Sequence, residues 1–349
     1  MENVIKQCIG IDVSQNVIDV TFGVYGLDQS VEFVASRSFK NVEKSFPLFL
    51  QWALKLSKTE IPLSFVMEST GVYHERLACF LFDNKQNVIV VLPSRASNFA
   101  KSLEVKTITD KEASKSLTRM GLEKKMELWV KPEPVYQVLK QLTREREQLQ
   151  KAKTMNSNQV HAESKSAWPN EASLKRAKKR IKTLEAQIKE IEAEIRETIK
   201  DHPELDRKIQ YMTSINGVGI LTAATLVGET NGFAMIKHKR QLVSYAGYDV
   251  IRKDSGTSVH AKPRISKKGN RHIRKAMHCP ALCSIKYNEK DKNHFSRMVQ
   301  KHGIKMKGVV AIQRKVLILM YSLWKKEAFF DPNYINPQLK KEIGQLALP

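Results

Sequence analysis

A small hydroxyl group stands in a strongly basic part of the sequence: Ser255, which Gly256 follows directly. Glycine leaves the backbone open, so a bulky substrate can approach the serine at this point. Cations crowd the same stretch: Arg252, Lys253, Lys262, Arg264, Lys267, Lys268, Arg271, Arg274 and Lys275. Such cations bind a phosphodiester and neutralise charge in its transition state. The stretch 245–277 therefore suits a serine nucleophile acting on nucleic acid; the alternative is an ordinary turn serine in a basic binding loop.

Three carboxylates stand at the ends of predicted elements in the first part of the chain. Asp12 follows a strand pattern, Glu68 follows the apolar strand pattern 62–67, and Asp110 begins a helix pattern beside Lys111. Acids at strand ends stand at a sheet edge, where α/β proteins bind metals and phosphates. If the three converge in one cleft they need a cation, and hard oxygen ligands suit Mg²⁺ or Mn²⁺. Each acid taken alone is also explained as a turn or capping residue.

Charge indicates the kind of partner. The 349 residues carry a formal net charge of +23, with a sequence pI near 9.8. Such a charge favours a polyanion, nucleic acid first and an anionic membrane second. The sequence contains no apolar run long enough to span a bilayer, so we expect no membrane segment. It begins without a signal-peptide pattern, and its four cysteines form no disulfide or zinc framework, which predicts a cytoplasmic protein with reduced thiols.

Residues 1–130 alternate between strand and helix patterns. Strands are predicted on both sides of 14–16 and at 30–38, 62–67 and 87–92. Apolar residues at helical spacing predict helices at 46–56 and from about 71 to 82. This alternation indicates an α/β domain with a mixed sheet.

The middle of the chain is charged and helical between 135 and 200. Its second half has an apolar seam at alternating three- and four-residue steps: Leu174, Ala177, Ile181, Leu184, Ile188, Ile191, Ile195 and Thr198. Such a seam is typical of a coiled coil. An earlier helix is expected to return against it, with the turn near 168–170. The seam favours self-association as a dimer or tetramer; a helical hairpin within one chain is the alternative.

The last part of the chain is predicted to be mainly helical. Ile215–Gly219 precedes an alanine-rich helix and resembles a helix-hairpin-helix, in which free N–H groups hold a phosphate. Helices are predicted at 271 to about 284 and at 306–326, with a hairpin or irregular segment at 248–265. The candidate nucleic-acid-binding residues are Lys111, Gly217, Gly219, Arg252, Lys253, Arg264, Lys267, Lys268, Asn270, Arg271 and Arg274.

Seven motifs occur in one order along nearly the whole chain: GIDVSQ, MESTGVY, TDKEASKSL, INGVGILTAA, SYAGYDV, DSG and ISKKGN. Together they resemble the insertion-sequence transposases of the IS-one-ten family, which includes Piv-type DNA invertases and bridge-RNA-guided recombinases. The resemblance implies a RuvC-like (RNase H-related) α/β domain at 1–130 and a coiled-coil arm at 131–204. It also implies a mainly α-helical transposase domain at 205–330, followed by a tail at 331–349.

The resemblance also implies the site residues. Family members hold a metal with three aspartates and one glutamate, and Asp12, Glu68 and Asp110 match the first three positions. The serine of the last domain is the family's nucleophile, and Ser255 is the matching residue, with Thr257 and Ser258 as weaker candidates. The acids and their cation would activate the hydroxyl, which is weak at its free pKa.

One position departs from the family pattern. The last aspartate should fall three residues after Asp110, where this chain has Ala113. A methyl group cannot bind a metal, and the neighbouring Glu112 is expected to point elsewhere because each helical residue turns by roughly 100°. Either the lineage lost the acid or the acid was replaced to stall the enzyme; the intact motif around it favours replacement.

The function implied is a DNA recombinase that excises and inserts its own mobile element in a bacterial or archaeal cell, close to the nucleoid. A bridge RNA would pair with donor and target DNA, so that base pairing carries the specificity. Two alternatives remain: a metal-dependent Holliday-junction-type nuclease without serine chemistry, and a catalytically dead nucleic-acid-binding variant.

Overall fold

The computed structural model describes residues 4–69, 71–103, 109–255 and 259–334, with the side chains of 252–263 outside the description. It divides the chain into two compact units, Met1–Lys131 and Pro132–Pro349. The predicted tail lies largely outside the described residues. Within them, no helix combines the length and the apolar character that crossing a membrane requires.

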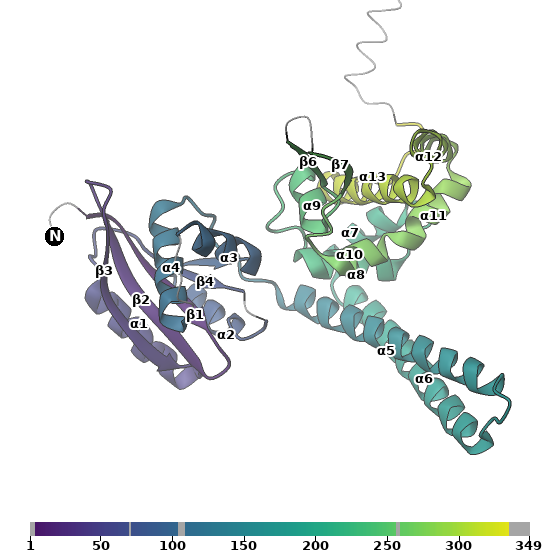
Figure 1. Cartoon of the computed structure of the whole chain (residues 1–349), viewed down its shortest axis with the longest axis horizontal. Coiled ribbons are helices and arrows are strands. Elements are labelled where there is room, and N and C mark those ends of the chain that lie inside the picture. Colours follow the sequence, from purple (N-terminus) through teal and green to yellow (C-terminus); the bar gives the residue numbers. More distant parts are fainter. Residues whose placement is uncertain (1–3, 70, 104–108, 256–258, 335–349) are drawn as a thin grey trace, which may run out of the picture. The chain divides into compact units, whose positions relative to one another are not determined.

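The first unit is built on a five-stranded mixed sheet (Figure 1). Its strands are β1 (Val4–Val13), β2 (Val17–Gly26), β3 (Val31–Lys40), β4 (Leu63–Glu68) and β5 (Asn87–Val91). The order is β3-β2-β1-β4-β5, in which β1, β2 and β3 are antiparallel neighbours and β4 and β5 run parallel to β1. The predicted mixed sheet is confirmed, and it fits the RNase H-like α/β domain that the motifs imply.

Helices cover both faces of this sheet. They are α1 (Phe46–Leu56), α2 (Glu75–Asp83), α3 (Pro93–Ser102) and α4 (Asp110–Glu123). On one face, Phe49 of α1 and Leu77 of α2 pack with Ile9 and Phe65 of the sheet. On the other face, Ala96 of α3 and Leu117 of α4 pack with Val66 and Ile89. Strands buried on both faces explain the near-continuous apolar runs of the sequence.

Helix α4 packs close to the sheet because a glycine of β1 and small hydroxyl-bearing residues of α4 and β2 form the contact. A Cβ added at Gly10 would lie 2.2 Å from the Ser114 carbonyl oxygen. The Gly10 N–H donates to Thr118 Oγ1 (3.0 Å), and Thr118 Oγ1 donates to the Thr21 carbonyl (2.8 Å). Thr21 Oγ1 and Ser114 Oγ are 2.8 Å apart. These buried contacts fix the start of α4, and with it Asp110, beside the end of β1.

The second unit begins with a helical hairpin, α5 (Pro134–Ser164) and α6 (Glu171–Lys200) (Figure 1). Asn170 caps α6 by accepting from the Ser173 N–H (3.0 Å), so the turn falls where the sequence predicts it. Most of the apolar seam of α6 is buried, and α6 packs along α5 of the same chain. Ion pairs such as Lys153–Glu185 (2.9 Å) also cross the two helices. The seam is therefore satisfied within one chain, as in the hairpin alternative, and no longer supports self-association.

A helical bundle follows the arm. It contains α7 (Pro203–Thr213), α8 (Ile220–Thr230), α9 (Lys239–Ala246), α10 (Arg271–Ala276), α11 (His278–Tyr287), α12 (Glu289–His302) and α13 (Lys305–Lys326). Between α9 and α10, β6 (Val250–Ser255) and β7 (Val259–Ile265) form a two-stranded antiparallel hairpin. The predicted core helix is confirmed as α13, whose Ile312, Leu317 and Met320 are fully buried.

One helix boundary in this bundle was predicted wrongly. The sequence pattern favours a single helix from 271 to about 284, but the structure ends α10 at Ala276 and begins α11 at His278. Pro280 explains the break, because its ring would clash with the carbonyl of residue 276 in a continuous helix and it has no N–H to donate. In the structure Pro280 instead lies in the first turn of α11, where a proline is tolerated.

Candidate functional site

The three acids predicted from the sequence influence one another in the first unit. Asp12 lies near the end of β1, Glu68 ends β4 and Asp110 begins α4. Burial raises the pKa of Asp12 to about 6, and the charges of Asp110, Glu68 and Asp19 add to the rise. Burial also raises the pKa of Glu68. Crowded carboxylates with raised pKa values mark a place where a cation would relieve repulsion.

The chemistry of these carboxylates suits a divalent cation, but their positions do not form a complete set of metal ligands. Their oxygens are the hard donors that Mg²⁺ and Mn²⁺ take. Among the described residues, however, no group of three or more Asp, Glu, His or Cys side chains is close enough to hold a metal ion. The raised pKa of Asp12 thus reflects burial first and the neighbouring carboxylates second, and it is not evidence of coordination geometry.

A cavity of about 270 Å³ lies beside the acids, between α3 and α4. Glu68 and Ala113 both line it, so the position where the family has its last aspartate does face the same space as Glu68. Glu112 also lines this cavity, as do the small residues Ala96 and Ala100 of α3. Lys115 holds the Glu112 carboxylate at 2.7 Å.

Asp19 is a member of this acidic group that the sequence reasoning missed. It lies directly opposite Asp12 in the β1–β2 register and accepts a hydrogen bond from the Ser38 hydroxyl. The predicted turn at 14–16 does not give this register, because pairing outward from it would set Ile18 against Asp12. The observed pairing places the two-residue loop at 15–16, which puts Asp19 opposite Asp12 and on the same face of the sheet.

Ser255 is the last residue of β6, and its backbone pairs with Val259 of β7. The β6–β7 hairpin therefore carries the predicted nucleophile at its tip. Side chains that lie outside the described part of the chain include Ser255, Arg252, Lys253 and Lys262; Gly256, Thr257 and Ser258 lie outside it altogether.

The other predicted nucleic-acid-binding residues fall into two groups. Exposed cations are Lys111 in the first unit and Arg264, Lys267, Lys268 and Arg271 in the second. Arg274 and Asn270 have structural contacts instead. Arg274 donates to the carbonyls of Ala246 (2.8 Å) and Gly269 (3.1 Å), while Asn270 caps α10 by accepting from the N–H groups of His272 and Ile273.

The two glycines of the helix-hairpin-helix pattern differ. Gly217 has a positive φ of 88°, and a Cβ there would lie 2.4 Å from Cys283 Cβ, so close packing already requires a glycine. Gly219 is the N-cap of α8 and is exposed, and an added Cβ would meet nothing within 4 Å. Both glycines are exposed, and an added side chain has room at Gly219 but not at Gly217.

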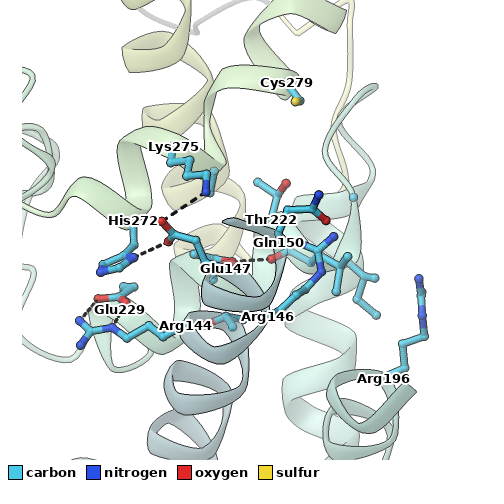
Figure 2. Close-up of a pocket in the computed structure, with 16 residues that line it drawn as sticks. Arg144, Arg146, Glu147, Gln150, Arg196, Thr222, Glu229, His272, Lys275 and Cys279 are labelled. Carbon is cyan, nitrogen blue, oxygen red and sulfur yellow. Dashed lines mark hydrogen bonds and ion pairs between the residues drawn. The ribbon is translucent and has the colours of Figure 1, made fainter. Parts of the chain in front are cut away.

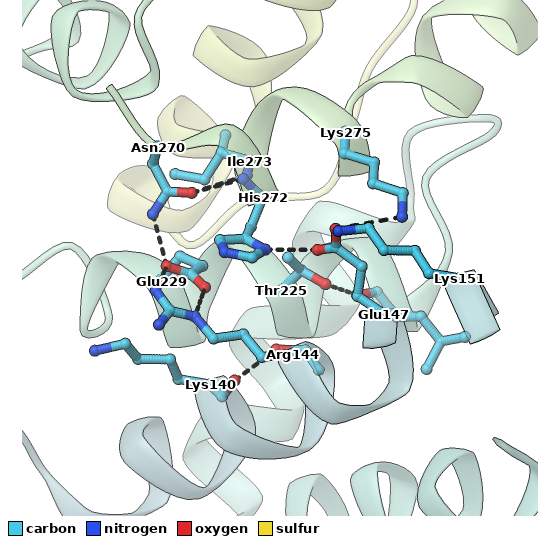
Figure 3. A network of polar contacts seen from close by, with 12 residues as sticks. Lys140, Arg144, Glu147, Lys151, Thr225, Glu229, Asn270, His272, Ile273 and Lys275 are labelled. Carbon is cyan, nitrogen blue, oxygen red and sulfur yellow. Dashed lines mark hydrogen bonds and ion pairs between the residues drawn. The ribbon is translucent and has the colours of Figure 1, made fainter. Parts of the chain in front are cut away.

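A buried polar network joins α5, α8 and α10 (Figure 3). Glu229 of α8 accepts two bonds from Arg144 of α5 (2.6 and 2.9 Å) and one from Asn270 Nδ2 (2.6 Å). Burial raises the pKa of Glu229, but the bonds from Arg144 and Asn270 outweigh it, and the net direction is downward. The signal for this network was Glu229 itself, a lone acid directly after the apolar helix pattern 220–228, because a buried charge needs a partner.

Glu147 forms the second half of this network (Figure 3). It lies within 2.5 Å of His272 Nδ1 and pairs with Lys151 (3.2 Å) and Lys275 (3.3 Å). Burial raises its pKa, but hydrogen bonds from His272 and Lys151 and the charges of His272 and Lys275 outweigh this and lower it to about 2. Nothing in the sequence distinguished Glu147 from the many other charged residues of α5.

Comparison with known proteins identifies the class. A DEDD-type IS110 transposase model matches residues 9–169, and the model "Transposase IS116/IS110/IS902 family" matches residues 209–296. Between them they match residues in both structural units. The chain belongs to the IS110 (IS-one-ten) family of transposases.

Individual relatives agree with this assignment. The "Pilin gene-inverting protein" of Moraxella bovis is 28% identical over 336 residues, which is 93% of this chain and 98% of that protein. An IS110 protein of Streptomyces coelicolor is 27% identical over 34% of this chain and 29% of its own length. Among solved structures, T. thermophilus RuvC in complex with a Holliday junction substrate has a TM-score of 0.26 and 9% identity, covering 32% of this chain and 90% of that one.

Proposed function

We propose that this transposase cleaves and exchanges DNA strands with Ser255 as the nucleophile, and that strand cleavage also requires Asp12, Glu68 and Asp110. The proposal is supported chiefly by the positions of the three acids near the end of β1, at the end of β4 and at the start of α4. The charges of Asp110 and Glu68 there add to the effect of burial on the pKa of Asp12. Crowded carboxylates of this kind are typical of sites that perform chemistry. The family assignment and the position of Ser255 at the tip of the β6–β7 hairpin support the choice of nucleophile.

The cleavage step transfers a phosphoryl group to the serine. The Ser255 hydroxyl oxygen attacks phosphorus and forms a new P–O bond, and its proton passes to a base. The P–O bond to the 3′ oxygen breaks, and that oxygen takes up a proton to give a free 3′-OH. The 5′ end of the DNA is then held as a phosphoserine, so the bond energy is kept for rejoining to another 3′ end.

Asp12, Glu68 and Asp110 are the residues that would hold Mg²⁺ or Mn²⁺. A bound divalent cation neutralises charge on the phosphate oxygens and polarises the phosphorus centre. Ala113 removes one oxygen ligand from this set, so we expect this chain to bind the cation weakly. The catalytically silent, nucleic-acid-binding alternative is favoured by that same substitution and by the absence of a closed ligand set among the described residues.

Specificity is proposed to come from a guide. We infer that a bridge RNA pairs with donor and target DNA while the protein binds backbones and shape. The relatives in Moraxella are gene-inverting proteins, which supports exchange of defined DNA segments. Exchange needs two cleaved duplexes at once, so we also propose a dimer or tetramer as the active form. The large positive net charge supports both nucleic-acid partners.

The test is a denaturing gel with end-labelled donor DNA, bridge RNA and Mg²⁺. We expect the Ala113→Asp variant to give a labelled protein–DNA band that the unmodified chain gives weakly or not at all. Adding Ser255→Ala to Ala113→Asp should abolish the band. Cleavage without any covalent band would instead favour the metal-dependent nuclease. Binding with neither cleavage nor a band after restoration of the acid would favour the silent binding protein.

A further inference from the structure

We propose that a cavity at the junction of α5, α6, α8 and α10 binds the phosphodiester backbone of a nucleic-acid strand. The cavity measures about 400 Å³ and lies wholly in the second unit (Figure 2). None of its lining residues belongs to the β6–β7 hairpin that carries Ser255. The cavity is thus a second binding site for the strand, separate from the proposed nucleophile. This inference rests on the proposed function only in taking nucleic acid as the partner.

The charge of the lining favours an anion. Four guanidinium or ammonium groups line the cavity, against two carboxylates. The cations are Arg144, Arg146, Arg196 and Lys275, and the carboxylates are Glu147 and Glu229. Both carboxylates are already surrounded by donors from the protein, as described above, so they offer little repulsion to an incoming phosphate. Only 1% of the Glu229 side chain is exposed.

Arg196 of α6 is the cation most available to a ligand. It is exposed, and within the described part of the chain its side chain forms neither a hydrogen bond nor an ion pair. Arg146 by contrast is bound to Glu192 at 2.6 Å, and Lys275 shares Glu147 with Lys151 and His272. An unpaired guanidinium at a cavity wall suits a phosphate, which its planar fork can bind at two oxygens.

The start of α8 adds to this positive wall. Gly219, Ile220, Leu221 and Thr222 line the cavity at the first turn of the helix, and the open surface at Gly219 lets a ligand reach the backbone. The N-terminal end of a helix carries partial positive charge and N–H groups without helical partners. Ile220, Leu221 and Ala276 also give the cavity an apolar part, which suits the sugar of a nucleotide.

A strand fits this cavity better than a single free ion. Lys275 and Arg196 come from different helices, and Figure 2 shows them on opposite sides of the cavity. Cations on two sides can contact successive phosphates of one backbone. The volume is also within the range of pockets that take a nucleotide-sized group. Either a DNA strand or the RNA presents this chemistry, and the two are separated by experiment.

The first test measures binding of the full chain to labelled single-stranded DNA, duplex DNA and RNA by fluorescence anisotropy at several salt concentrations. We expect Arg196→Ala to weaken binding of at least one of them by about threefold to tenfold. It should also reduce the slope of log affinity against log salt by about one unit, as for one lost phosphate contact. The control is Arg297→Ala, an exposed arginine of α12 outside the cavity. Equal affinity and slope for the two variants with every nucleic acid would overturn the proposal.

The second test uses Cys279, an exposed thiol that also lines the cavity. Saturating oligonucleotide should slow alkylation of Cys279 by iodoacetamide about fivefold or more, while Cys79 of the first unit provides the reference rate. Unchanged alkylation of Cys279 would contradict the proposal, and equal protection by inorganic phosphate would contradict a strand as the ligand. Ser255→Ala should show the same protection, so a failure of the serine mechanism and a failure of this site give different results.

Discussion

Arg144 of α5 and Glu229 of α8 form a two-point ion pair, with Nε 2.6 Å from Oε1 and Nη2 2.9 Å from Oε2. The Glu229 side chain is 1% exposed and that of Arg144 is 41% exposed. Since Asn270, the cap of α10, bonds the same carboxylate, this pair ties the helical arm to the segment that directly follows the β6–β7 hairpin. Three side chains therefore connect the arm to the segment that follows the hairpin of the proposed nucleophile.

Loss of that pair should be costly. Arg144→Met leaves the Glu229 carboxylate buried with Asn270 as its remaining side-chain donor, and we expect the free energy of unfolding to fall by about 2–3 kcal/mol. The expected loss of unfolding free energy is somewhat smaller than for breaking a fully buried ion pair, because water reaches Arg144. Lys153→Met, which removes a half-exposed ion pair from the same helix, should cost at most about 1 kcal/mol. Equal losses in urea unfolding would contradict a special role for Arg144.

Acid should remove the contribution of Glu147. Its pKa lies at about 2 in the folded protein against an ordinary value of 4.5, so the ionised form is favoured by folding. The stabilisation is complete above pH 4.5 and is lost as the pH falls from 4.5 towards 2. We expect Glu147→Gln to lower the free energy of unfolding at pH 6 by at most about 3 kcal/mol. The gap between the two proteins should close towards pH 2; a gap that stays constant over that range would contradict this account.

The close packing of α4 on β1 predicts a sharp response at Gly10. Gly10→Ala places a methyl group 2.2 Å from the Ser114 carbonyl, so α4 must shift and the unfolding free energy should fall by about 1–3 kcal/mol or more. Because α4 carries Asp110, the same shift should lower the pKa of Asp12, measured by NMR titration. Gly219→Ala, where a methyl group meets nothing within 4 Å, is the matched control and should fold normally. Normal stability of Gly10→Ala would be inconsistent with the packing.

Restoring the missing ligand should strengthen cation binding. With Ala113→Asp we expect Mg²⁺ to raise the melting temperature more than it does in the unmodified chain. A tenfold gain in affinity corresponds to about 1.4 kcal/mol at saturating cation. The asparagine of Ala113→Asn has nearly the same shape as aspartate but carries no charge, so this variant should gain much less affinity for Mg²⁺. An equal Mg²⁺ response of all three proteins would mean that position 113 is not part of a cation site.

The acidic site was predictable in part because its members sit at strand ends. Strand ends can be read from apolar runs and turns, as Asp12 and Glu68 show. Asp19 was not found because its place depends on the pairing register of β1 and β2. That Glu112 lines the cavity beside Ala113 could not be predicted, because a helix wheel gives directions around one helix and says nothing of the small residues of α3.

The second unit shows a different limit of sequence reasoning. A seam such as Ile188, Ile191 and Ile195 predicts that a helix has an apolar partner, but the same pattern serves a partner within the chain or outside it. Long-range ion pairs are harder still: Arg144 and Glu229 are 85 residues apart, and no local pattern links them. The break between α10 and α11 could have been predicted, since Pro280 marks it in the sequence.

The most direct measurement is the identity of the amino acid that becomes linked to DNA. The protein–DNA adduct formed by Ala113→Asp with Mg²⁺, donor DNA and RNA can be digested and its nucleotide-bearing peptide sequenced by mass spectrometry. We predict that the nucleotide mass lies on Ser255, through a phosphate ester. A nucleotide mass on Thr257, on Ser258 or on any other residue would contradict the central claim, as would cleaved DNA without any linked peptide.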